Sequence, residues 1–264
     1  MLMIRLMNMF SNVIVRKPCC KISDGITSDS SLGKPEYKNA LRQHDVYVKA
    51  LKNCNVEVII LDADENYPDS CFVEDVAVLG KDFAIITNPG AHSRKGEEKE
   101  IIDVIKQFYD EKNIEYIMSP GTLEGGDVMM VGNHFYIGLS ARTNKEGALQ
   151  LISILEKYGC SGTVVSLKEV LHLKTGLAYL ENNNLLVSGE FVNSPEFKGF
   201  NKIIIEREES YSANCIWVND RVIIPEGYPR TLEAVNKAGY ETIIVDTSEF
   251  RKIDGGLSCL SLRF

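Results

Sequence analysis

Short hydrophobic runs occur in pairs along the chain, and a turn sequence separates the two members of each pair. In the first pair, residues 74–78 and 83–86 flank Gly80 and Lys81. Paired β-type runs around Gly, Asn or Asp are typical of β-hairpins. Similar pairs occur within residues 126–137, 176–187 and 213–224. The units begin near residues 74, 126, 176, 213 and 255, and a repeat of roughly forty to fifty residues favours a radial or solenoid array.

Amphipathic helical segments lie between the hairpins. In residues 145–158, for example, Leu151, Ile154 and Leu155 recur at helical spacing. The predicted helices span residues 35–53, 95–108, 145–158 and 229–238, and strands are expected at 56–61, 114–118, 163–166, 202–205 and 242–245. The module is therefore helix, strand, loop and hairpin, repeated about five times.

A single α/β domain over residues 1–264 is predicted, because no Pro-, Gly- or Ser-rich linker divides the modules. Turning one αβ module around an axis would bring its loops together at a central cavity. A doubly wound parallel sheet is the alternative, but the frequent hairpins disfavour it because parallel crossovers need intervening helices. Residues 1–11 are mostly apolar and lack a small-residue cleavage site, so we expect a short flexible leader and not a signal peptide.

Composition narrows the class of partner. The chain of 264 residues is 44% hydrophobic and 25% charged, which is typical of an ordinary soluble globular protein. A net charge of −8 argues against nucleic acid and anionic membranes, and no apolar run is long enough to span a bilayer. The seven cysteines are odd in number and show no CxxC spacing, which favours a reduced, cytoplasmic chain without structural zinc.

Candidate catalytic residues lie at equivalent places in different units. Cys259 belongs to the last unit, His172 opens the third, and Glu124 and Asp127 open the second. In a radial fold these positions would face one cavity. An imidazole beside a thiol can assist nucleophilic catalysis, and a carboxylate such as Glu124 can orient the imidazole. Taken alone, Cys259 and His172 are equally compatible with core packing, and Asp127 with a turn.

The remaining polar residues indicate the substrate. Asp69, Glu74 and Asp75 precede or open the first hairpin and would need a cation to balance them. A guanidinium group would do so through paired hydrogen bonds. Arg94 and Arg142 each follow the second strand of a unit, so both could hold an α-carboxylate at the rim of the cavity, although each alone would be typical of a surface arginine.

Nearly the whole chain from about residue 12 resembles the dimethylarginine dimethylaminohydrolases, most closely the bacterial enzymes. This family belongs to the guanidino-group-modifying superfamily, and the resemblance implies its five-bladed αβ-propeller, or pentein, fold. The motifs that carry the resemblance are long and widely spread. They are residues 24–28, 67–75, 87–94, 123–127, 138–144, 170–180, 212–219, 228–230 and 251–264.

The resemblance implies a role for each candidate catalytic residue. Cys259 would be the nucleophile, His172 the general acid and base, and Glu124 the residue that orients His172. The implied reaction is hydrolysis of Nω-methylated arginine to citrulline and methylamine or dimethylamine. It would proceed through a covalent thiouronium intermediate, without a metal or another cofactor.

The resemblance also implies how the substrate is held, as a small guanidino amino acid. Its guanidinium would lie near Asp75 and Glu74, with Asp69 in the surrounding polar network. Its α-carboxylate would bind Arg94 and Arg142. Its amino end would meet the backbone carbonyls of Ile26, in a mobile lid loop, and Ile253.

Two other functions remain open from the sequence. Arginine deiminases use the same covalent chemistry on unmethylated arginine, but usually carry an inserted helical domain for which 264 residues leave little room. A non-catalytic propeller would share the fold but has no reason to place Cys, His and Glu at equivalent positions. The sequence does not decide between a monomer and a homodimer, nor the preference among methylated and free arginine.

Overall fold

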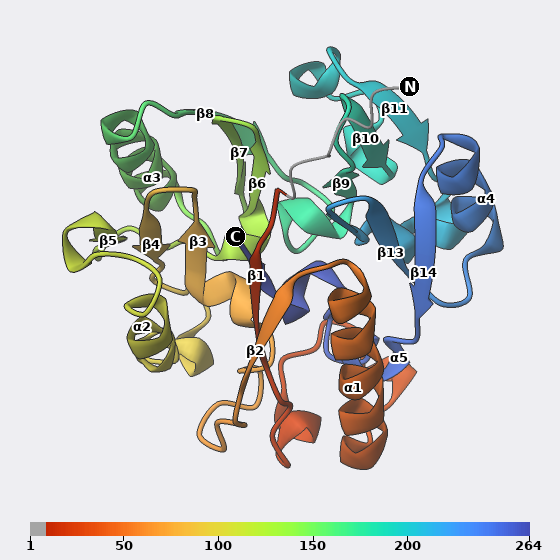
Figure 1. Ribbon diagram of the computed structural model, residues 1–264, viewed down its shortest axis with the longest axis horizontal. Helices are drawn as coiled ribbons and strands as arrows, with labels where there is room; N and C mark the ends of the chain where they lie inside the picture. The colour runs from red at the N-terminus through yellow and green to blue at the C-terminus, as the bar shows by residue number, and fades with distance from the viewer. Residues whose placement is uncertain (1–8) are drawn as a thin grey trace.

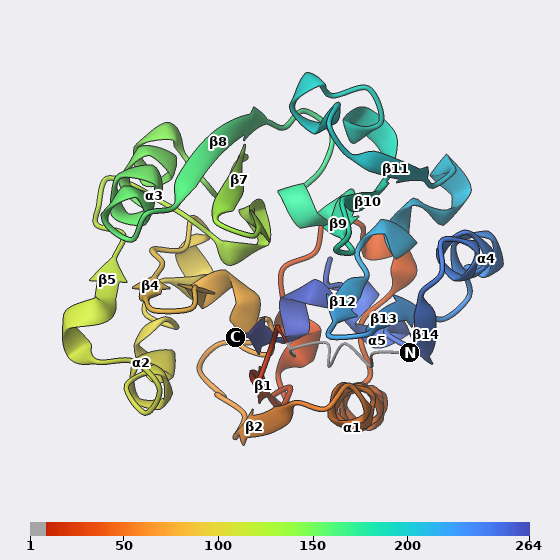
Figure 2. The ribbon, with the colours of Figure 1, turned by 45° about the horizontal axis from the view of Figure 1, so that its top comes forward.

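Five three-stranded sheets surround a central axis in the computed structural model, which describes residues 9–264 (Figure 1). Figure 2 shows the sheets as blades around the centre, with helices on the outside. The first sheet combines the two ends of the chain, and the other four follow in sequence order. The sheets are β15 (Leu262–Arg263), β1 (Asn12–Arg16) and β2 (Glu57–Leu61); β3 (Ala77–Leu79), β4 (Ala84–Ile86) and β5 (Ile114–Tyr116); β6 (Val128–Val131), β7 (His134–Leu139) and β8 (Ser161–Ser166); β9 (Leu177–Tyr179), β10 (Asn184–Val187) and β11 (Asn201–Ile204); and β12 (Ile216–Val218), β13 (Arg221–Pro225) and β14 (Glu241–Val245).

Each blade has the same pairing. The middle strand runs antiparallel to the first strand and parallel to the third, as for β7 between β6 and β8. The hairpin forms the antiparallel pair, and the connection that contains the helix returns the chain to the parallel position. The fivefold αβ propeller predicted from the repeat is therefore confirmed.

The ring closes by pairing the first strand with the last. Val13 lies opposite Arg263 and Ile14 opposite Leu262 in antiparallel register. The second strand of the unit near residue 255 thus comes from the start of the chain. Phe10 also packs on Trp217, with ring centroids 6.2 Å apart, so part of the expected 1–11 leader belongs to the fold. The rest of that leader, residues 1–8, lies outside the described residues.

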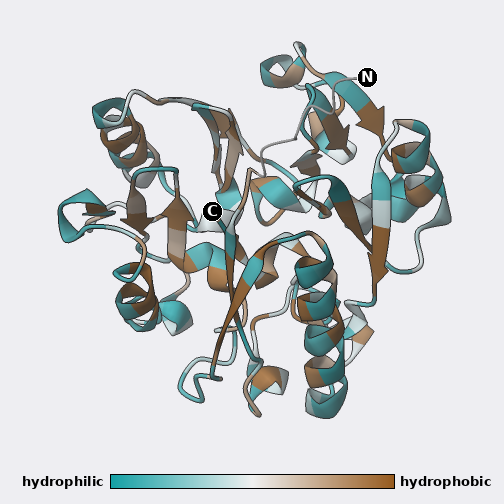
Figure 3. Cartoon of the chain, in the orientation of Figure 1, coloured by the Kyte–Doolittle hydropathy of each residue, from teal (hydrophilic) through white to brown (hydrophobic). Residues whose placement is uncertain are grey.

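The four predicted helices are present, with ends shifted by a few residues. They are α1 (Tyr37–Asn53), α2 (Lys99–Ile105), α3 (Lys145–Lys157) and α4 (Pro229–Lys237), and a short α5 (Ser248–Arg251) was not predicted. Figure 3 shows α1 with alternating hydrophilic and hydrophobic patches, since Tyr47 and Leu51 face the core. Between β10 and β11 the connection contains 3₁₀ turns and no α-helix. Among residues 9–264, no helix is long and apolar enough to cross a membrane.

Short 3₁₀ turns surround the axis at the start of the hairpins. The residues that the sequence pattern predicts as the first strand positions, Glu74–Val76 and Gly126–Asp127, lie in such turns. Along the ring each of these turns contacts the next. They are η11 (Ser258–Leu260), η3 (Val73–Val76), η6 (Gly125–Asp127), η7 (Leu173–Thr175) and η10 (Arg207–Ala213). These turns, and not the strands, carry most of the candidate site residues.

Gly125→Ala is expected to destabilise the ring of turns. A Cβ at Gly125 would lie 1.9 Å from the carbonyl oxygen of Glu74 and 3.0 Å from that of Ala77, and backbone atoms cannot move aside cheaply. We expect a loss of about 1–3 kcal/mol in the free energy of unfolding, as for other overpacked interiors. Thermal unfolding measures it. Gly199→Ala is the matched control, because nothing lies within 4 Å of its Cβ position. Equal melting temperatures for both variants would contradict the expectation.

Candidate active site

One cavity near the axis contains nine of the ten residues predicted for the site. Cys259, His172 and Glu124 line it together with the predicted substrate-binding residues other than Glu74, namely Ile26, Asp69, Asp75, Arg94, Arg142 and Ile253. The cavity measures about 30 Å³, which is room for about one or two water molecules. Ser28, two residues after Ile26, is held to Asp254 by two exposed hydrogen bonds.

Cys259 lies on η11, where its side chain is buried at 8% exposure. Asn214 fixes this turn by accepting a hydrogen bond from the backbone N–H of Ser258 at 2.8 Å, and Gly256 allows the close approach. Burial raises the pKa of the Cys259 thiol, and the carboxylates of Asp75 and Glu74 raise it further. The thiol is therefore protonated at neutral pH.

His172 and Glu124 form a buried pair. His172 Nε2 lies 2.7 Å from Glu124 Oε2, in hydrogen-bond contact. Burial alone lowers the pKa of His172, but Asp75, the bond to Glu124 and the charge of Asp127 outweigh it and raise the pKa to about 9. Burial raises the pKa of Glu124, yet His172 and Arg94 hold it below its usual range. The pair is thus an imidazolium and a carboxylate at neutral pH.

The backbone fixes the other side of Glu124. Its Oε1 accepts hydrogen bonds from the N–H groups of Gly90 at 3.1 Å and Ala91 at 3.2 Å. Its own N–H donates to Thr143 Oγ1 at 3.1 Å. Because both carboxylate oxygens have partners, Glu124 can hold the ring of His172 in one orientation.

Asp75 faces the cavity with a fixed carboxylate. Its Oδ1 accepts from the N–H of Gly126 at 3.0 Å, and its Oδ2 lies 2.5 Å from Arg94 Nη1. Arg94 is also paired with Glu97 through Nε at 2.9 Å and Nη2 at 2.7 Å. Arg94 is therefore a buried structural cation, and most of its donors are used before a substrate binds.

Arg142 is the freer of the two arginines and lies in a turn beside the cavity. Its backbone N–H donates to Ser140 Oγ at 3.0 Å. A Cβ at Gly90 would lie 2.2 Å from the carbonyl oxygen of Arg142, so this glycine lets the turn approach. Arg142 is half-buried and lines the cavity, which suits binding of an anionic group at the cavity rim.

Asp69, Ile26 and Ile253 form the edge of the cavity. The backbone N–H of Ile26 donates to Asp69 at 3.0 Å, so Asp69 anchors the loop that carries Ile26. Ile253 is buried and its backbone N–H is bonded to the carbonyl of Phe250. All three line the cavity.

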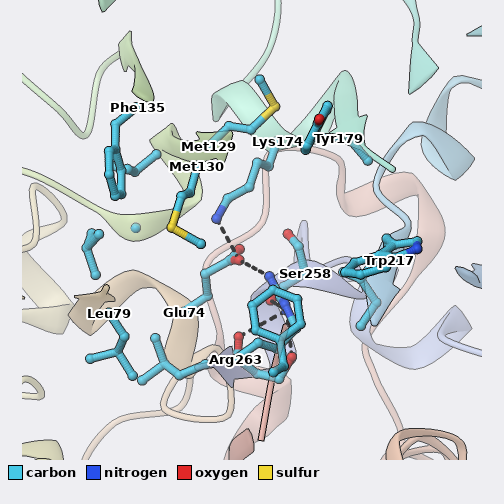
Figure 4. A pocket seen from close by; sticks show the side chains of 18 of the residues that line it. Glu74, Leu79, Met129, Met130, Phe135, Lys174, Tyr179, Trp217, Ser258 and Arg263 are labelled. Carbon is cyan, nitrogen blue, oxygen red and sulfur yellow. Dashed lines mark hydrogen bonds and ion pairs between the residues drawn. The ribbon is translucent and has the colours of Figure 1, made fainter. Parts of the chain in front are cut away.

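The side chain of Glu74 points to a second cavity on the axis. Its Oε1 lies 2.6 Å from Lys174 Nζ and 3.0 Å from Arg263 Nη2 (Figure 4). Consecutive residues of a 3₁₀ turn project in different directions, so Asp75 lines the active-site cavity and the side chain of Glu74 lines the other. Glu74 joins the first, third and last units across the axis.

Asp75, Glu124 and His172 are the group within residues 9–264 with the spacing of metal ligands. One atom from each lies within 4.8 Å of the others. Each already has a protein partner, through Arg94 and the pair of Glu124 with His172. A divalent ion would have to break these bonds and approach the guanidinium of Arg94, so the surroundings suit a cationic substrate group better than a metal.

Sequence reasoning missed the residues that support the site. Glu97 holds Arg94, and Ser140 and Thr143 hold the turn that carries Arg142. Glu97 had a local signal, because a spacing of three residues places Glu97 and Arg94 on the same side of a helical turn. Ser140 had one too, since its hydroxyl accepts the backbone N–H groups two and three residues further on, as serine does in turns. The contact of Thr143 with Glu124 spans 19 residues and had no local signal.

Comparisons with known proteins agree on one family. Residues 27–193 match the family model described as N,N dimethylarginine dimethylhydrolase, eukaryotic. The chain is 60% identical to the N(G),N(G)-dimethylarginine dimethylaminohydrolase of Pseudomonas aeruginosa, over 97% of this chain and 100% of that protein. It is 32% identical to the protein of that name from Streptomyces coelicolor, over 95% of each chain.

Solved structures extend the comparison to the fold. Two structures of dimethylarginine dimethylaminohydrolase, 59% identical to this chain, superpose with a TM-score of 0.95 over 97% of this chain and 100% of theirs. The first is a Cys-to-Ser variant of the Pseudomonas aeruginosa enzyme complexed with citrulline, and the second is a His-to-Gly adduct with S-methyl-L-thiocitrulline. The N-terminal domain of ArgZ, a cyanobacterial arginine dihydrolase, shares the fold with a TM-score of 0.82 at 18% identity, over 96% of each chain. The sequence and its relatives together place this chain in the dimethylarginine dimethylaminohydrolase family.

Proposed function

We propose that this protein hydrolyses Nω-methylated arginine to citrulline and dimethylamine or methylamine. The observation that carries the proposal is the single cavity in which Cys259, the His172–Glu124 pair and Asp75 lie together. A thiol, an imidazolium and a carboxylate are the groups needed to attack a cationic guanidinium carbon and protonate its leaving amine. The 60% identical relative bears the name of this activity.

In the first half-reaction the guanidinium lies against Asp75, and its charge favours ionisation of Cys259, whose proton passes to solvent. The thiolate attacks the guanidinium carbon and forms a C–S bond. The imidazolium of His172 then donates a proton to the substituted nitrogen, and the C–N bond breaks as the amine leaves. Glu124 stabilises the charged ring before this transfer. The product on the enzyme is a thiouronium at Cys259.

In the second half-reaction His172 is neutral and acts as a base. It removes a proton from water as the water oxygen attacks the thiouronium carbon. The tetrahedral intermediate loses its hydroxyl proton to solvent and collapses with cleavage of the C–S bond, which releases citrulline and restores the thiolate. His172 ends the cycle as an imidazolium, so one residue serves both steps.

The stoichiometry of the products tests the proposed reaction. Incubation with asymmetric dimethylarginine should give citrulline and dimethylamine in equal amounts. Citrulline can be measured by its ureido colour reaction and the amine by chromatography. If citrulline forms without dimethylamine, or if neither forms, the proposed reaction is wrong.

Glu124→Gln is expected to move the titration of the His172 imidazole to lower pH. In the wild type the midpoint should lie near pH 9, because the pKa of His172 is about 9. A neutral amide removes the charge and the ionic hydrogen bond that raise this pKa, so the midpoint, read from the imidazole signal in NMR spectra, should fall by about one unit or more. We also expect kcat/KM to fall by about 10²-fold or more. Glu156→Gln, at an exposed position, is the control. An unmoved midpoint would show that Glu124 does not tune His172.

Arg142→Leu is expected to raise KM by about tenfold or more while kcat changes little. A remote α-carboxylate is bound equally in the ground state and the transition state, so its loss appears in KM. The KM of Arg142→Lys should lie between those of the wild type and Arg142→Leu, because an ammonium cannot form the paired hydrogen bonds of a guanidinium. A dimethylated guanidine substrate without the α-carboxylate should not distinguish the three proteins. If it does, Arg142 has another role.

We propose further that the enzyme acts in the cytoplasm and needs neither a metal nor another cofactor. The seven free cysteines are compatible with a reducing compartment. A homodimer remains one of two expected assembly states, and sedimentation of the purified chain would distinguish it from a monomer.

A further inference from the structure

A single buried carboxylate, that of Asp127, joins three parts of the active site. It has no exposed surface. Its Oδ1 accepts the N–H of Leu173 at 2.9 Å, the residue directly after His172. Its Oδ2 accepts the hydroxyl of Ser140 at 2.6 Å, in the turn that carries Arg142. Asp127 itself belongs to η6, directly after Glu124 and two glycines.

The other hydrogen bonds of Ser140 fix the direction of its bond to Asp127. Its Oγ accepts the backbone N–H groups of Arg142 at 3.0 Å and Thr143 at 3.1 Å. A hydroxyl has two acceptor sites and one proton, so both acceptor sites are occupied and the proton must go to Asp127. Asp127 therefore has to act as an acceptor at both oxygens, which an ionised carboxylate does and an amide does not.

The neighbouring backbone is shaped to fit these bonds. A Cβ at Gly138 would lie 3.0 Å from Asp127 Oδ1 and 3.1 Å from Leu173 Cβ, so a side chain there would press on the bond between them. Thr143, which is fully buried, accepts the N–H of Glu124 at 3.1 Å. The network thus links the segments that carry Glu124, Arg142 and His172.

Resting on the proposed function, we infer that Asp127 is a positioning residue that sets both the acid–base group and the carboxylate-binding arginine. It acts on His172 through the N–H of Leu173 and through its charge, and on Arg142 through Ser140. Binding of the substrate carboxylate and the proton affinity of His172 are therefore coupled through one side chain. Asp75 and Glu124 are the other carboxylates that act on His172, and Arg94 lies near Glu124.

Two substitutions separate the effect of Asp127 on His172 from its effect on Arg142. Asp127→Asn keeps the shape and an acceptor for Leu173, but removes the charge and places an N–H₂ against Ser140, whose acceptor sites are already occupied. We expect KM to rise by about tenfold or more and the titration of His172 to move to lower pH. Ser140→Ala breaks the route to Arg142 alone. It should raise KM by a similar factor and leave that titration in place.

A measurement without turnover distinguishes this inference from the proposed function. The chain has four histidines, so the imidazole signal of His172 can be assigned in NMR spectra by comparison with His172→Asn. Its titration should move to lower pH in Asp127→Asn and stay unchanged in Ser140→Ala. If His172 titrates in this way but the wild-type protein does not hydrolyse dimethylarginine, the inference holds and the proposed function is wrong.

The inference is overturned if Asp127→Asn folds and changes neither the His172 titration nor KM, or if it only lowers the melting temperature. If Asp127→Asn does not fold, Ser140→Ala and Thr143→Val decide. Both should raise KM for dimethylarginine but not for a substrate analogue without the α-carboxylate. An unchanged KM in both variants would also overturn it.

Discussion

Cys259→Ser is expected to lower kcat for citrulline formation by on the order of 10⁴-fold or more. The hydroxyl is a far weaker nucleophile than the thiolate, and loss of a nucleophile in a covalent mechanism removes nearly all of the acceleration. The fold should be unaffected, because the oxygen is smaller than the sulfur and Cys259 forms no disulfide. A citrulline assay with asymmetric dimethylarginine measures the loss.

The control for this variant is a second buried cysteine, Cys215. It lines the axial cavity and not the active site, and burial raises the pKa of its thiol to about 12. Cys215→Ser should retain activity within a few-fold. Calorimetric titration of Cys259→Ser with citrulline should still show binding, since the residues around the cavity are intact. Substantial turnover by Cys259→Ser would exclude the covalent mechanism.

His172→Gly is expected to lower kcat for dimethylarginine by about 10³-fold, within the range lost when a general acid–base group is removed. A dialkylamine must be protonated to leave, so formation of the intermediate should slow most. S-methyl-L-thiocitrulline has a thiol leaving group that needs no proton from His172. Its intermediate should therefore form and then persist, because no base activates water for the second step.

Intact-mass spectrometry tests this difference. His172→Gly incubated with S-methyl-L-thiocitrulline should gain the mass of one thiouronium adduct, located at Cys259 after digestion. The doubly substituted chain with Cys259→Ser is the control and should gain none. Failure of the adduct to accumulate would mean that His172 is not the base of the second step. A His-to-Gly relative has been crystallised as an adduct with this compound.

The repeat was predictable because it depends on a pattern that recurs along the chain. Similar sequences that begin at five places indicated five units. Because Cys259 and His172 occupy equivalent positions in their units, we expected them to face one cavity. The pattern did not show that β1 supplies a strand of the last blade, because pairing between the two ends of a chain has no local signature. It also did not show that residues 189–197 form 3₁₀ turns in place of a helix.

The direction of each side chain within a turn was the least predictable feature. Alternating hydrophobic residues around Glu74 and Asp75 favoured a strand, but buried carboxylates and close glycines produce a 3₁₀ turn. Neighbouring residues there face different cavities, so Asp75 lines the active site and Glu74 pairs with Lys174. Arg94 and Arg142 looked equivalent in sequence, but Glu97 binds Arg94 and not Arg142. The direction of Glu74 depends on partners in other units, whereas the partner of Arg94 lies three residues along the chain.

Steady-state kinetics with asymmetric dimethylarginine, monomethylarginine and arginine in parallel test the central claim most directly. The same preparation and a Cys259→Ser blank serve all three substrates. The account predicts that kcat/KM is higher for both methylated substrates than for arginine, and that the blank gives no citrulline. One or two methyl groups are worth roughly 1–3 kcal/mol in an apolar pocket, so the preference should be about 10-fold or more. Faster turnover of arginine than of either methylated form would contradict the account and identify a deiminase.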